Sequence, residues 1–121
     1  MNGNGYQQYK EQSVMTMTQG ELLLLLYDEL LKRLKRAEIA LGMENYELFE
    51  QSVGRSVEIV NYLKDTLNHN YTISMELGNM YDFFIYELSR LQAGRKKETI
   101  QELQPLVKDL RDAFAAAEKA V

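Results

Sequence analysis

Residue types that could support catalysis or metal binding are scarce in this chain. It has one histidine, His69, and no cysteine among 121 residues. A metal site inside a helical bundle draws on Glu-x-x-His motifs from two helices, and no such motif occurs. His69 lies between two asparagines, which is typical of a solvated loop, whereas a phosphotransfer histidine has to be exposed in the middle of a helix. No nucleophile with a base and no phosphate-binding loop is evident. We therefore expect no enzyme, no metal site and no cofactor.

Charge and composition exclude further classes. The net charge is −4, and the acidic residues alternate with lysines and arginines along the chain. This pattern predicts a solvated helix surface and no nucleic-acid partner. The longest leucine run has five residues, far short of the roughly 20 apolar residues needed to span a bilayer, so we expect no membrane insertion. With no cysteine and no signal peptide, the composition indicates a single domain in the cytoplasm.

The stretch 18–41 organises the rest of the chain. Thr18 and Glu21 have the spacing of a capping box, which predicts a helix start. Apolar residues then recur at alternating steps of four and three, which places them in one stripe on a helix. The stripe consists of Leu23, Tyr27, Leu30, Leu34, Ala37 and Leu41. Leucines off this stripe make the first half of the helix apolar almost all round, so it must be covered on more than one side.

Three further apolar stripes with the same spacing follow. They consist of Phe49, Val53, Ser56, Val60, Leu63 and Leu67, then Leu77, Tyr81, Phe84, Leu88 and Leu91, and finally Ile100, Leu103, Val107, Leu110, Phe114, Ala117 and Val121. Four helices with short connections make antiparallel neighbours. The sequence predicts an all-α protein, an antiparallel up-down-up-down four-helix bundle spanning 18–121.

Local signals predict where the helices end. Gly42 and Gly94 follow the first and third stripes, where a left-handed C-cap favours glycine. The second helix is predicted over 45–68, and Ser74 is the predicted N-cap of the third. Pro105 lies inside the fourth stripe and removes one backbone N–H, so we expect this helix to be kinked or split there.

More apolar helix surface is present than one core requires, which favours a binding module for an apolar or amphipathic helix. Self-association of two copies through the same surface is the competing interpretation. We predict that the residues contacting a client are Leu22, Leu25, Tyr27, Met80 and Phe83.

Residues 1–17 are rich in glycine, asparagine and glutamine at first and cannot bury enough apolar surface to order alone. We expect a flexible N-terminal tail. Tyr6 and Tyr9 are spaced so that the tail could lie across a groove as a lid. An incidental terminus is the alternative.

Five motifs along the chain resemble the FliS family of flagellar secretion chaperones. They read YQQY at 6–9, TQGEL at 18–22 leading into LYD at 26–28, TLN at 66–68, LGNMYDF at 77–83 and LRDAF at 110–114. The match covers nearly all of the chain in the order and spacing of the family. Each motif alone is weak, and five in register are specific.

The resemblance implies a helical bundle without enzymatic activity that binds the C-terminal segment of newly made flagellin. In the family this binding prevents premature polymerisation and delivers flagellin to the cytoplasmic domain of the flagellar export gate. The N-terminal tail of the family can fold back over the flagellin groove, which would assign a role to Tyr6 and Tyr9. A helical bundle that regulates a transcription or signalling factor remains the alternative from another class.

Overall fold

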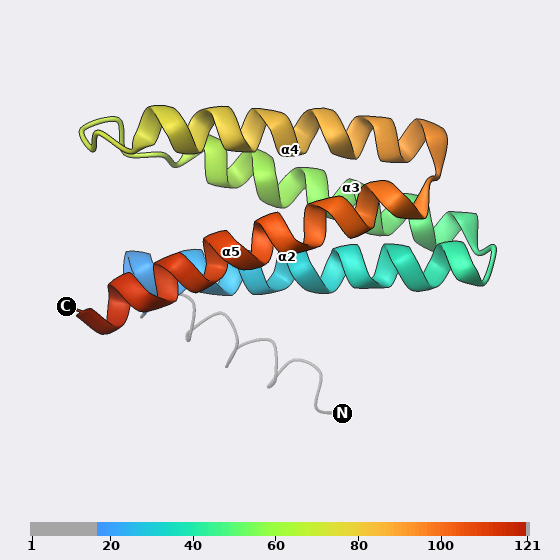
Figure 1. Cartoon of the computed structure of the whole chain (residues 1–121), viewed down its shortest axis with the longest axis horizontal. Coiled ribbons are helices and arrows are strands. Elements are labelled where there is room, and N and C mark those ends of the chain that lie inside the picture. The colour runs from blue at the N-terminus through green and yellow to red at the C-terminus, as the bar shows by residue number, and fades with distance from the viewer. Residues whose placement is uncertain (1–16, 121) are drawn as a thin grey trace, which may run out of the picture.

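Four helices that alternate in direction make up residues 17–120, the part of the chain that the computed structural model describes (Figure 1). Their bounds are α2 (Gln19–Gly42), α3 (Tyr46–Asp65), α4 (Ser74–Gly94) and α5 (Lys97–Ala120). No strand occurs in this described part. The predicted all-α, up-down-up-down bundle is therefore confirmed. Tyr6 and Tyr9 lie outside the described residues.

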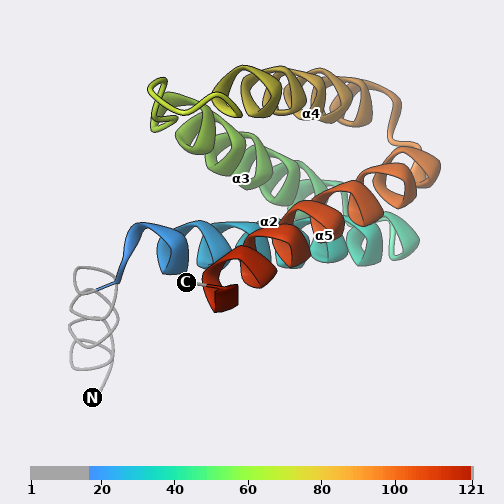
Figure 2. The same cartoon turned by 60° about the vertical axis from the view of Figure 1, so that its left-hand side comes forward.

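The packing of the helices leaves one side of the bundle looser than the others. Helix α2 packs against both α3 and α5, and α4 packs mainly against α3, with a smaller contact to α5. Figure 2 shows α5 alongside α2, with α4 set away from that pair. Within residues 17–120, no helix has the length and apolar character that crossing a membrane requires.

Burial follows the predicted stripes. Tyr27, Leu30 and Leu34 of α2 are at most 1% exposed, and every predicted stripe residue of α4 is buried. The stripes loosen toward the helix ends, since the side chains of Leu41 and Leu67 are only partly buried and Ala117, predicted in the fourth stripe, is exposed. Because the buried positions repeat with the helical period, each helix presents one continuous face to the common core.

The start of α2 is capped by Thr18, which forms its half of the predicted capping box. The Thr18 side-chain oxygen accepts a hydrogen bond from the Glu21 backbone N–H at 3.1 Å. The Thr18 hydroxyl in turn donates to the Glu21 carboxylate at 3.2 Å. This pairing satisfies one of the N–H groups that the first helical turn leaves without a partner.

The glycine caps predicted after α2 and α4 are wrong. Gly42 and Gly94 are the last helical residues, and the left-handed backbone lies further on, at Glu44 with φ 55° and Arg95 with φ 52°. At Arg95 a tertiary contact offsets the cost of the left-handed backbone. The guanidinium group of Arg95 stacks over the Tyr46 ring, 4.0 Å from the ring centroid. Such a cation–π contact stabilises a conformation that glycine would adopt without strain.

The predicted boundaries around α3 and α4 also need correction. Asn45 caps α3 through its side chain, which accepts from the Leu48 N–H at 3.1 Å. Helix α3 ends at Asp65 instead of residue 68, where the Thr66 hydroxyl donates to the Tyr62 carbonyl at 2.8 Å. Ser74 is the first helical residue of α4 and is buried, so it is not the N-cap.

Helix α5 is continuous through Pro105, so it is not split there. Proline removes the N–H that would bond to the Gln101 carbonyl one turn earlier. Both Gln101 and Pro105 are exposed, and water can therefore satisfy that carbonyl.

Candidate binding groove

An apolar groove opens at the end of the bundle that carries the connection between α3 and α4. Its volume is about 670 Å³, within the range of about 300 to 1,000 Å³ typical of ligand sites. All four helices and the loop contribute to it. The lining residues are Gln19, Leu23, Tyr62, Leu63, Thr66, Leu67, Asn68, Tyr71, Ile73, Ser74, Leu77, Tyr81 and Phe114.

A pair of buried tyrosines lies at the base of this apolar groove. Tyr81 lines the groove but is only 1% exposed, and its hydroxyl shares a hydrogen bond of 2.5 Å with the hydroxyl of Tyr27, which is fully buried. The Phe114 ring lies 5.5 Å from the Tyr27 ring, centroid to centroid. These contacts join α2, α4 and α5, so the base of the groove is a rigid part of the core.

The tyrosine pair stays neutral at physiological pH. Burial raises the pKa of the Tyr27 hydroxyl far above its ordinary value, and the hydrogen bond with Tyr81 raises it further. Burial also raises the pKa of Tyr81, against a lowering contribution from its bond with Tyr27. An uncharged base suits an apolar ligand, because no ion has to be desolvated when the groove is filled.

The walls of the apolar groove carry exposed apolar side chains. Tyr62 is 47% exposed, Tyr71 66% and Ile73 52%. Large side chains that are free in the unbound protein but lie around a concave site are those that a ligand would desolvate. Aromatic and aliphatic side chains together line the groove, and such surfaces fit the apolar face of an amphipathic helix.

The residues predicted to contact a client do not line this groove. Tyr27 is fully buried, so its side chain belongs to the core and offers no surface to a client in this structure. Leu22, Leu25 and Met80 are partly buried, and Phe83 is 44% exposed on α4. None of the five residues lines the apolar groove, so a client that contacts them would occupy a different surface.

Part of the groove that sequence reasoning missed lies in the connection between α3 and α4. Tyr71 and Ile73 stand in a stretch that is mostly polar, so helical periodicity could not detect them. The available signal was the presence of large apolar residues in a solvated loop. His69 lies in the same connection and is exposed, as predicted.

Charged residues near the groove form ion pairs across the helices. Arg111 of α5 donates to Asp28 of α2 at 3.0 Å, and Lys64 of α3 pairs with Asp82 of α4 at 2.6 Å. Hydrogen bonding to Asp82 raises the pKa of Lys64. Within residues 17–120, no cluster of histidine and acidic side chains has the arrangement of a metal site.

Two comparisons of the sequence indicate one family, and a comparison of structures matches the fold. The model of a family described as "Flagellar protein FliS" matches residues 2–121. The chain is 35% identical over 116 residues to the flagellar secretion chaperone FliS of Bacillus subtilis (strain 168), covering 94% of this chain and 86% of the relative. A solved structure described as a flagellar chaperone from bacteria aligns over 100% of both chains with a TM-score of 0.83 and 18% identity. At that identity the structural likeness concerns the fold.

Proposed function

The chain belongs to the FliS family of flagellar secretion chaperones, and from this premise we propose that its apolar groove binds the C-terminal segment of flagellin. The observation that carries this proposal is the groove itself. It combines a neutral, rigid base around Tyr81 with exposed apolar walls at Tyr62, Tyr71 and Ile73. A segment that folds into an amphipathic helix on binding can place its apolar side chains there.

Covering this segment accounts for the chaperone activity. An apolar helix face that is free in solution can pair with further copies of flagellin, and its burial in the groove removes that surface. We further infer that the complex forms in the cytoplasm and is handed to the cytoplasmic domain of the flagellar export gate. Binding of moderate affinity suits this role, because the client has to be released at export.

We propose that the N-terminal segment, residues 1–17, acts as a lid on the apolar groove. The proposal is supported by Gln19, the first residue of α2, which lines the apolar groove. Tyr6 and Tyr9 are the apolar side chains that we propose to cover the groove when no client is present. The docked lid gains little, because ordering each residue costs roughly 1 kcal/mol or more, and the client can therefore displace it.

The test is titration of the full chain with the C-terminal peptide of flagellin from the same organism. We expect Ile73→Asp to weaken binding by at least about tenfold, or 1.4 kcal/mol, since it puts a charge into an apolar contact. Ile73 precedes the first residue of α4, where aspartate is favourable to a helix. We therefore expect the variant to stay folded, and its melting temperature checks this.

Two matched variants decide where the client binds. Ile39 is 50% exposed, close to the 52% of Ile73, but does not line the groove, so Ile39→Asp should leave affinity within about twofold. Phe83→Asp tests the surface predicted from the sequence. If Phe83→Asp abolishes binding and Ile73→Asp does not, the client lies on the outer face of α4 and the assignment of the groove is wrong.

A further inference from the structure

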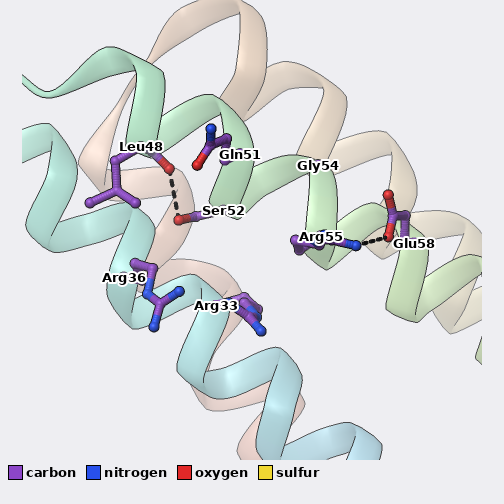
Figure 3. Close-up of a pocket in the computed structure, with 8 residues that line it drawn as sticks. All are labelled: Arg33, Arg36, Leu48, Gln51, Ser52, Gly54, Arg55 and Glu58. Carbon is purple, nitrogen blue, oxygen red and sulfur yellow. Dashed lines mark hydrogen bonds and ion pairs between the residues drawn. The ribbon is translucent and has the colours of Figure 1, made fainter. Parts of the chain in front are cut away.

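A second groove, between α2 and α3, is rich in arginine. Its volume is about 650 Å³, and its lining includes Arg33 and Arg36 of α2 with Leu48, Ser52, Gly54 and Arg55 of α3. Figure 3 shows the two α2 arginines along the helix beside the stretch of α3 that carries Ser52, Gly54 and Arg55. No residue lines both this arginine groove and the apolar groove. The two surfaces are therefore separate sites.

The arginine groove is positively charged, whereas the whole chain is negatively charged. Three arginines and a single glutamate, Glu58, line it, whereas the net charge of the chain is −4. Arg55 pairs with Glu58 at 3.0 Å and Arg33 with Glu29 at 3.8 Å. Arg36 is exposed and makes no ion pair with any residue in 17–120. The structure thus concentrates positive charge that is only partly compensated.

Gly54 provides an independent observation. It lies inside α3, where glycine destabilises a helix relative to alanine. A Cβ atom built at Gly54 would meet nothing within 4 Å, so the packing of this chain does not require a glycine there. The residue lines the arginine groove. A close approach by the backbone of a second molecule is a physical reason for a glycine at an open position of this kind.

We propose that the arginine groove is a docking site for an acidic segment of a partner protein other than the client of the apolar groove. Guanidinium groups bind carboxylates through two parallel hydrogen bonds, and Leu48 offers an apolar contact beside them. The groove engages a few carboxylates, whereas nucleic-acid binding requires an extended surface that neutralises many phosphates. The site therefore matches a short run of aspartate or glutamate.

The probe is a labelled helical peptide of about 14 residues, or four turns, with a glutamate at every third or fourth position. Its control has glutamine at those positions. By fluorescence polarisation at about 0.1 M salt, the glutamate peptide should bind at least about tenfold more tightly. Arg36→Glu should remove this difference. Lys119→Glu, which makes the same charge change in the last turn of α5, should retain it.

Glycine variants test the approach of the partner separately. Gly54→Ala should raise the melting temperature by about 3 to 6 °C, and Gly54→Leu should weaken peptide binding at least about tenfold by filling the groove. Gly42 also has open space around its Cβ position and does not line the groove, so Gly42→Leu should bind normally. These measurements do not involve flagellin, so they succeed or fail independently of the apolar groove.

Three results would overturn the proposal. The first is equal binding of the glutamate and glutamine peptides, including no measurable binding of either. The second is an equal loss in Arg36→Glu and Lys119→Glu, which would assign the effect to net charge. The third is binding of single-stranded DNA of the same total charge as tightly as the glutamate peptide, which would identify a general polyanion site.

Discussion

Removing one hydroxyl of the buried tyrosine pair should destabilise the bundle more than removing both. Tyr27 and Tyr81 are 0% and 1% exposed, and their hydroxyls bond to each other. Tyr27→Phe leaves the Tyr81 hydroxyl buried without its partner, which costs about 1 to 3 kcal/mol. Tyr81→Phe should cost a similar amount for the same reason. The double variant removes both polar groups at nearly constant shape, so its stability should lie within about 1 kcal/mol of the wild type.

Urea unfolding followed by circular dichroism measures these differences. A loss of 2 kcal/mol lowers the midpoint by about 1 M for a protein of this size.

The tyrosine pair also predicts that stability depends on pH. Burial raises the pKa of Tyr27 above its unfolded value of 10.0, so the stabilisation is complete below about pH 10. Above it the unfolded chain loses a proton that the folded chain keeps, and stability falls by about 1.4 kcal/mol per pH unit.

The double variant should lose this contribution to alkaline unfolding, whereas variants outside the pair should keep it. If each single substitution is neutral, water reaches the remaining hydroxyl and the base of the apolar groove is not dry. Additive losses in the double variant would show that the two hydroxyls do not depend on each other, which would refute the reasoning from the hydrogen bond.

Three further predictions concern the core, the surface and the tail. Leu30→Ala should cost about 2 to 5 kcal/mol, as for other buried leucines, and Leu25→Ala much less; equal losses in urea unfolding would contradict the assignment of faces on α2. Arg111→Gln breaks a partly exposed ion pair with Asp28 and should change stability by less than about 1 kcal/mol; a larger loss of stability would give that pair a structural role. Deleting residues 1–12 should keep the bundle folded, increase ANS binding and tighten flagellin-peptide affinity by no more than about tenfold; weaker peptide binding would mean that the tail contacts the client.

Sequence alone determined the four helices and their buried faces. Helix formation and amphipathicity are read from residues a few positions apart, so the stripes through Leu30, Val60, Leu88 and Val107 predicted the core correctly. The Thr18 cap is also local and was predicted. Membership of the FliS family was predicted from motifs in register along the chain, because the order and spacing of motifs are properties of the sequence itself.

Tertiary structure decided the helix ends and both grooves. Left-handed backbone at Arg95 is accompanied by contacts to Tyr46 and Glu50, which come from another helix. The apolar groove joins residues as distant as Leu23 and Phe114, and the arginine groove sets Arg55 beside two arginines of α2. Charge and hydropathy patterns are read from residues that are neighbours in sequence. A groove is formed by side chains from separate helices, whose relative rotation and offset are set by core packing.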